Sequence, residues 1–138
     1  MNTGFTDPQR TELIQRALEV RKNAYAKYSE FSVGASLLTS DGKFFDGVNV
    51  ENASFGLTVC AERSAVFAAV SAGQRKIIAI AIATDGGHAP CGACRQVLSE
   101  FDDDMAILMV DTSEPSKILQ STLNELLPGR FVFPSEKK

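Results

Sequence analysis

Three cysteines have the spacing of a metal site. Cys91 and Cys94 are three residues apart, so on a helix both sulfurs lie on one face and can bind one ion. Cys60 stands at the start of an earlier predicted helix, and the partial positive charge at helix N-termini favours thiolates. The pattern therefore predicts a three-thiolate metal site at which the starts of two helices meet.

A carboxylate beside this site predicts proton transfer. Three protein ligands leave the fourth position of a tetrahedral Zn²⁺ to water, whose pKa falls to about 7. Glu62, two residues after Cys60, can take a proton from that water and return it to a substrate. Arg63 directly follows Glu62, and Arg95 directly follows Cys94. We expect one or both arginines to donate hydrogen bonds to the sulfurs and to offset their negative charge.

Two other uses of the cysteines fit parts of the pattern. A redox pair formed by Cys91 and Cys94 would leave Cys60 and Glu62 without a role. A purely structural zinc usually has four protein ligands, and His88, the single histidine of the chain, is the candidate for the fourth. His88 ends a Gly-Gly-His segment that we interpret as a flexible loop. The combined pattern favours the catalytic site.

The elements that must position these residues alternate between helix and strand. A capped amphipathic helix is expected from residue 6 or 7 to near Ser29, followed by a hairpin of strands 31–39 and 44–48. Further helices are expected at 60–72, 90–101 and 123–127, and further strands at 77–83, 105–110 and 117–122, the last antiparallel to its predecessor. The order predicts an α/β fold, a sheet with helices on both faces.

Composition limits the possible classes of protein. The chain has 138 residues, which predicts a single domain over 1–138, and its net charge of −3 without a basic run argues against nucleic-acid binding. The first ten residues are polar, and the longest apolar run, 77–83, is too short to span a membrane. An odd number of cysteines disfavours a disulfide framework. We expect a cytoplasmic protein without membrane partners.

Several segments together resemble the small cytidine deaminases with an all-cysteine zinc site. Cys-Ala-Glu followed by Pro-Cys-Gly-Ala-Cys is the zinc deaminase signature with cysteine in place of the first histidine. Segments 25–35, 47–53 and 126–131 extend the resemblance, which covers about residues 13–131. It implies a three-layer sandwich with a mixed five-stranded sheet. It also implies one Zn²⁺ per subunit, bound by Cys60, Cys91 and Cys94.

The resemblance also implies a reaction and a set of contacts. Zinc-activated hydroxide would attack C4 of cytidine or 2′-deoxycytidine, Glu62 would protonate N3, and ammonia would leave, a reaction of pyrimidine salvage. Asn49 and Glu51, which are alternate residues leaving a strand, would hold the ribose hydroxyl. Phe31 would pack against the base, and the backbone around Ala61 would bind the pyrimidine edge.

The same resemblance implies an assembly. Small members of the family are usually homotetramers whose sites are shared between subunits, so Phe131 and the loop around Phe55 would reach a neighbour's pocket. Three other functions remain to be separated from this one. They are a blasticidin S deaminase, a nucleic-acid editing deaminase, and a zinc-containing protein that performs no chemistry.

Overall fold

A mixed five-stranded sheet organises the chain. The computed structural model describes residues 4–102 and 104–134. Over these residues the strands β1 (Gly34–Thr39), β2 (Phe44–Val48), β3 (Ile77–Thr84), β4 (Ala106–Asp111) and β5 (Ile118–Thr122) lie in the order β2-β1-β3-β4-β5. Only the β3–β4 pair of this sheet is parallel. The predicted α/β fold with a mixed five-stranded sheet is confirmed.

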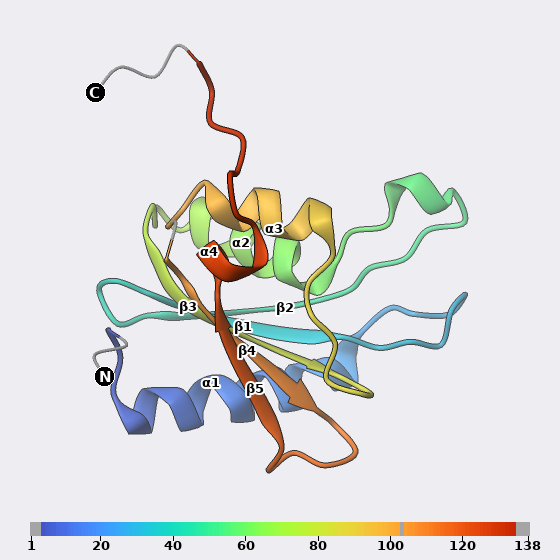
Figure 1. Ribbon diagram of the computed structural model, residues 1–138. Helices are drawn as coiled ribbons and strands as arrows, with labels where there is room; N and C mark the ends of the chain where they lie inside the picture. Colours follow the sequence, from blue (N-terminus) through green and yellow to red (C-terminus); the bar gives the residue numbers. More distant parts are fainter. Residues whose placement is uncertain (1–3, 103, 135–138) are drawn as a thin grey trace.

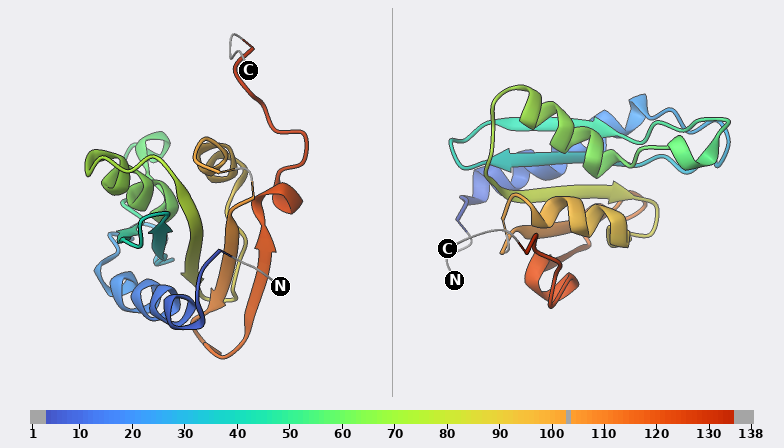
Figure 2. Two further views of the ribbon diagram at one scale, coloured as in Figure 1. Left: turned by 90° about the vertical axis from the view of Figure 1, so that its left-hand side faces the viewer. Right: turned by 90° about the horizontal axis from the view of Figure 1, so that it is seen from above.

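Helices cover both faces of this sheet, as Figures 1 and 2 show. Helix α1 (Asp7–Val20) packs on one face through Leu13 and Ala17, whereas α2 (Ala61–Ser71) and α3 (Gly92–Ser99) cover the other. The short helix α4 (Leu123–Leu126) follows β5, and two 3₁₀ turns, η1 (Arg21–Asn23) and η2 (Phe55–Leu57), complete the elements. Among the described helices, none combines the length and apolarity that a membrane crossing requires.

Helix α2 lies very close to the edge strand β2. A Cβ added at Gly47 would lie 2.3 Å from the backbone nitrogen of Ala65 and 2.6 Å from the carbonyl oxygen of Ala61. Only glycine permits this approach. The first turn of α2, which follows Cys60, is therefore seated directly on the sheet.

The expected boundaries are wrong between residues 21 and 33. Helix α1 ends at Val20 rather than near Ser29, and β1 begins at Gly34 rather than Phe31. The apolar spacing of Tyr25 and Tyr28 suggested a longer helix, but these side chains are 49% and 43% exposed. The intervening chain instead crosses the end of the sheet, where Tyr25 pairs with Val50 in an isolated bridge.

Candidate functional site

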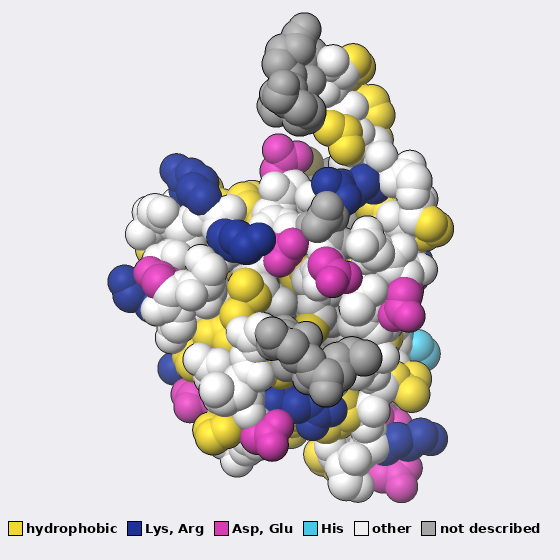
Figure 3. All heavy atoms as spheres, turned by 60° about the vertical axis from the view of Figure 1, so that its left-hand side comes forward, with side chains coloured by type: hydrophobic (Ala, Val, Ile, Leu, Met, Phe, Trp, Pro, Cys, Tyr) yellow, Lys and Arg dark blue, Asp and Glu magenta, His cyan; other side chains and the backbone are white. Residues whose placement is uncertain are grey.

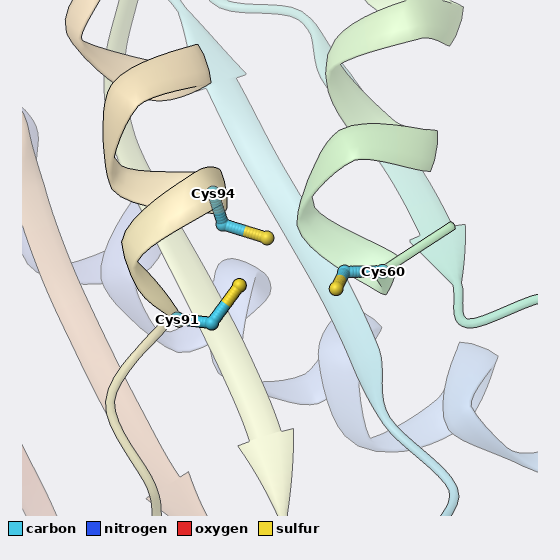
Figure 4. A group of neighbouring side chains, drawn as sticks. All are labelled: Cys60, Cys91 and Cys94. Carbon is cyan, nitrogen blue, oxygen red and sulfur yellow. The ribbon is translucent and has the colours of Figure 1, made fainter. Parts of the chain in front are cut away.

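The three cysteines, far apart in sequence, lie together above one end of the sheet. Their sulfur atoms are all within 4.8 Å of one another and their side chains point toward a common centre (Figure 4). Cys60 immediately precedes α2, Cys91 immediately precedes α3, and Cys94 lies in the first turn of α3. The predicted meeting of two helix starts is therefore present in the structure.

The chemistry and spacing of these sulfurs fit zinc. Thiolates are preferred ligands of Zn²⁺, and a tetrahedral ion with bonds of about 2.3 Å holds its sulfurs roughly 3.8 Å apart. The three sulfurs, all within 4.8 Å of one another, lie near that separation. The described residues place no fourth cysteine, histidine or carboxylate in the same cluster, which matches a site with an open position.

Electrostatics favour ionisation of Cys60. A hydrogen bond with the Cys94 thiol and a second from Arg63 lower the pKa of Cys60 to about 5. The Arg63 contact joins its Nη2 to the Cys60 sulfur at 3.3 Å. The same thiol pair raises the pKa of Cys94. Negative charge is thus stabilised first on the sulfur that faces the guanidinium.

Glu62 is buried beside this charge. Its side chain lies in the first turn of α2 with 6% exposure, and loss of solvent raises the pKa of the carboxyl. Burial favours the protonated form of this carboxyl, and a protonated carboxyl is the form that can return a proton to a substrate. The arrangement supplies a proton-transfer group next to a candidate metal.

The two arginines have different partners. Arg63 donates to the Cys60 sulfur, whereas Arg95 donates from Nε to the Pro90 carbonyl and from Nη1 to the Leu126 carbonyl, both at 2.8 Å. Arg95 therefore fixes the backbone before the Cys91–Cys94 hook and ties it to α4. Of the two, the structure gives a sulfur contact to Arg63.

We expect Arg63→Gln to lower kcat by about 10- to 100-fold without loss of zinc, as removal of a partner of a metal ligand does elsewhere. The amide has no positive charge to offset the thiolates, so the metal would polarise its water less. Steady-state kinetics and metal analysis test this, with exposed Arg75→Gln as the control. Unchanged kcat in Arg63→Gln would remove the role of the guanidinium.

A cavity of about 290 Å³ opens beside Cys60, Cys91 and Glu62. Its volume is close to the lower end, near 300 Å³, of small-molecule sites. The cavity brings together four residues that the sequence proposed as substrate contacts, namely Phe31, Asn49, Glu51 and Ala61. A substrate in the cavity would therefore reach both the metal cluster and the proton-transfer carboxyl.

Asn49 and Glu51 also shape the wall of this cavity. Asn49 accepts from Val33 N through Oδ1 at 2.9 Å and donates from Nδ2 to Phe31 O at 2.8 Å. Glu51 accepts from the backbone nitrogens of Tyr28 and Ser29 and from the Ser29 hydroxyl, which lowers the pKa of the carboxyl. These bonds explain why residues 28–33 belong to neither helix nor strand.

Phe131 is outside the cavity of its own chain. Its side chain is 66% exposed, and its carbonyl accepts from Gln96 Nε2 at 3.3 Å. The segment that contains it leaves the body of the molecule beyond α4 (Figure 1). The predicted reach of Phe131 into a neighbour's pocket stays a prediction.

Several lining residues were not predicted as substrate contacts, among them Ser29, Thr58, Thr84 and His88, which the sequence offered only as a fourth zinc ligand and which lies outside the cysteine cluster. Thr84 ends β3, and sites in α/β proteins commonly lie beyond the carboxyl ends of strands, so that rule would have identified it. The other three lie outside regular elements, where spacing in the sequence does not indicate the direction of a side chain.

Comparisons with known proteins agree with this geometry. Residues 7–110 match the family described as the cytidine and deoxycytidylate deaminase zinc-binding region. Cytidine deaminase from Halalkalibacterium halodurans is 46% identical over 125 residues, which cover 88% of this chain and 93% of the relative. A blasticidin-S deaminase from Bacillus cereus is 29% identical over 142 residues, with 95% and 98% coverage.

A solved structure shares the whole architecture. The crystal structure of cytidine deaminase from Burkholderia pseudomallei superposes with a TM-score of 0.84 and 43% identity, covering 92% of this chain and 100% of that one. This similarity confirms the expected three-layer sandwich. With the family match and the three clustered cysteines, it shows that the chain belongs to the cytidine deaminase family of zinc-dependent hydrolases.

Proposed function

We propose that the protein hydrolyses cytidine and 2′-deoxycytidine to uridine and 2′-deoxyuridine with release of ammonia, as a step of pyrimidine salvage. The observation that supports this most directly is the buried Glu62 carboxyl, which lines the same cavity as two of the three clustered cysteines. The reaction adds water at C4 of the base and breaks the C4–N4 bond.

Cys60, Cys91 and Cys94 would hold one Zn²⁺ per subunit. When bound there, zinc supplies a polarised water at its open coordination position. Glu62 takes a proton at its carboxylate from the attacking water and delivers it to N3 of the pyrimidine. The same carboxyl then takes the remaining proton of the oxygen added at C4 and passes it to the amino group, so that the C4–N4 bond breaks, the C4 carbonyl forms and ammonia leaves.

The walls of the cavity would bind the nucleoside. Phe31 packs against the base, and the backbone at Ala61, the first residue of α2, contacts the pyrimidine edge. Asn49 and Glu51 face the sugar, where Glu51 Oε2, which accepts from the Ser29 hydroxyl, retains acceptor capacity, whereas Oε1 already accepts from the backbone nitrogens of residues 28 and 29. Both sugars present the 3′-hydroxyl, so we expect both nucleosides to be substrates.

We further propose a cytoplasmic homotetramer of single-domain subunits, residues 1–138, with sites shared between subunits. An apolar groove of about 540 Å³ between α2 and α3 includes Phe67, which is 51% exposed and suits a contact with another subunit. Phe131 would cross to a neighbouring cavity. The molar mass from light scattering tests the assembly, and a monomer in solution would contradict it.

A free nucleoside suits this surface better than a polymer. On the face drawn in Figure 3, Lys and Arg side chains are interspersed with Asp and Glu side chains. Nucleic-acid binding usually needs a gathered positive surface that follows the phosphate backbone. We therefore propose neither nucleic-acid nor membrane partners.

The test of the function follows the ultraviolet absorbance of cytidine, deoxycytidine and blasticidin S with zinc-loaded protein. Turnover of both nucleosides, with little of blasticidin S, supports the proposal. Turnover of blasticidin S alone would assign the chain to that class of deaminase. Protein with full zinc that consumes none of the three would contradict deaminase activity on these substrates.

We expect Glu51→Gln to raise KM for cytidine by about tenfold or more, because the site loses a charged acceptor for the sugar hydroxyl. Gln still has one acceptor oxygen for the backbone of residues 28 and 29, so folding should survive. Kinetics with cytidine measure the effect. Exposed Glu30→Gln, in the adjacent segment, is the control, and equal KM values for the two variants would refute the sugar contact.

A further inference from the structure

We propose that His88 is a positioning residue for the substrate, acting through Phe31 at the mouth of the cavity. This inference rests on the proposed function, because Phe31 is the proposed platform for the base. His88 and Phe31 line the same cavity, and their ring centroids are 6.0 Å apart with planes tilted by 53°. His88 thus restricts the orientation of the ring that would support the base.

The loop that contains His88 is tied to the sheet, in contrast to the flexible loop expected from the sequence. His88 N donates to the Thr84 hydroxyl at 2.8 Å, and Gly86 N donates to the Asp111 carboxylate at 3.0 Å. Gly87 N donates to the Thr84 carbonyl at 3.2 Å. Thr84 and Asp111 are partners at the ends of the parallel strands β3 and β4. The backbone of His88 is therefore held by hydrogen bonds to the ends of two paired strands in the middle of the sheet.

The imidazole has its own restraint within this loop. Gly86 has φ of +101°, and a Cβ added there would lie 2.8 Å from His88 Nε2. The ring therefore lies directly against the Gly86 backbone. A side chain at position 86 would occupy the space that the imidazole fills. With Phe31 as a second neighbour, the imidazole contacts both the loop and the proposed base platform.

Phe31 depends on this contact because it is itself 41% exposed. Its backbone is fixed by Asn49 Nδ2 at the carbonyl oxygen, but that bond does not orient the ring. A neighbouring ring does orient it, since aromatic pairs prefer tilted geometries with centroids about 4.5–7 Å apart. We therefore assign to His88 an effect on substrate binding rather than on the proton transfers at Glu62.

The kinetic test compares four substitutions in the zinc-loaded protein. We expect His88→Ala to raise KM for cytidine by about three- to tenfold with kcat nearly unchanged, and His88→Phe to restore KM. Exposed Asp85→Asn in the same loop is the control, and melting temperatures should match throughout. Unchanged KM in His88→Ala overturns the inference, as does restoration by His88→Gln but not by His88→Phe.

A spectroscopic test separates this inference from the proposed function. His88 is the single histidine of the chain, so in tag-free protein its imidazole signals are the only histidine side-chain signals in an NMR spectrum. Uridine, the product of the proposed reaction, should shift these signals. The shift should reach its maximum in the range of uridine concentrations that inhibits turnover.

Each outcome of that titration decides one question. Turnover of cytidine with unshifted His88 signals at saturating uridine would overturn the role of His88 and leave the proposed function intact. Absence of both turnover and uridine binding in zinc-loaded protein would overturn the proposed function and, with it, the role of His88.

Discussion

Substitution of Glu62 by Gln should lower kcat for cytidine by about 10²- to 10⁴-fold while the protein keeps its zinc. The amide matches the carboxylate in size but cannot accept a proton from water or deliver one to N3. Metal analysis of the purified variant separates this loss from loss of the cofactor. Because the amide also fills the buried space of the carboxyl, the melting temperature should not fall.

Glu114→Gln is the matched control for this experiment, because Glu114 is exposed in the turn between β4 and β5 and does not line the cavity. Its kcat should equal that of the unaltered protein. A Glu62→Gln variant with nearly full kcat would assign proton transfer to another group and would contradict the mechanism proposed above.

The second large effect concerns the metal. Cys94→Ala should abolish zinc binding and turnover, because two thiolates from separate helix starts remain where three converged. Cys94 is completely buried, so the loss of metal should also loosen the packing of α2 against α3. We expect the melting temperature to fall by at least about 5 °C, measured by calorimetry beside zinc content.

Chelation supplies the comparison for this variant. Unaltered protein stripped of zinc under reducing conditions should show the same lowered melting temperature, and added zinc should restore both stability and turnover. Cys94→Ala should not respond to added zinc. One zinc per chain with normal turnover in this variant would show that the cysteines do not form the site.

Much of this architecture follows from local patterns in the sequence. The buried strands appear as continuous apolar runs, as at 77–83, and the cysteine spacing places two sulfurs on one helix face whatever surrounds them. The sequence predicts that Cys60 lies near Cys91 and Cys94 because the three cysteines together suit a metal site. Periodicity alone would not pair those two helices.

The errors arise where side chains replace the usual backbone partners. Residues 24–33 have the apolar spacing of a helix followed by a strand, yet Asn49 and Glu51 bind their backbone groups from a distant part of the chain. Such long-range hydrogen bonds leave no local signal. The position of His88 in the cavity wall could not be predicted for a similar reason, because it depends on Thr84 and Asp111 rather than on its neighbours in sequence.

Asn49 and Glu51 each bind the backbone of residues 28–33 and are also the proposed sugar contacts. This double role limits how the enzyme could evolve to accept new substrates. Substitutions that remove the acceptor or donor atoms at these positions alter the backbone wall and the proposed sugar contact together, so they should yield damaged enzymes; Glu51→Gln, which keeps one acceptor oxygen, is the exception. Phe55 and Thr58 line the adjoining hollow beside Glu51. None of the described hydrogen bonds to residues 28–33 comes from their side chains. Directed evolution toward modified sugars should therefore collect its first useful mutations at positions 55 and 58.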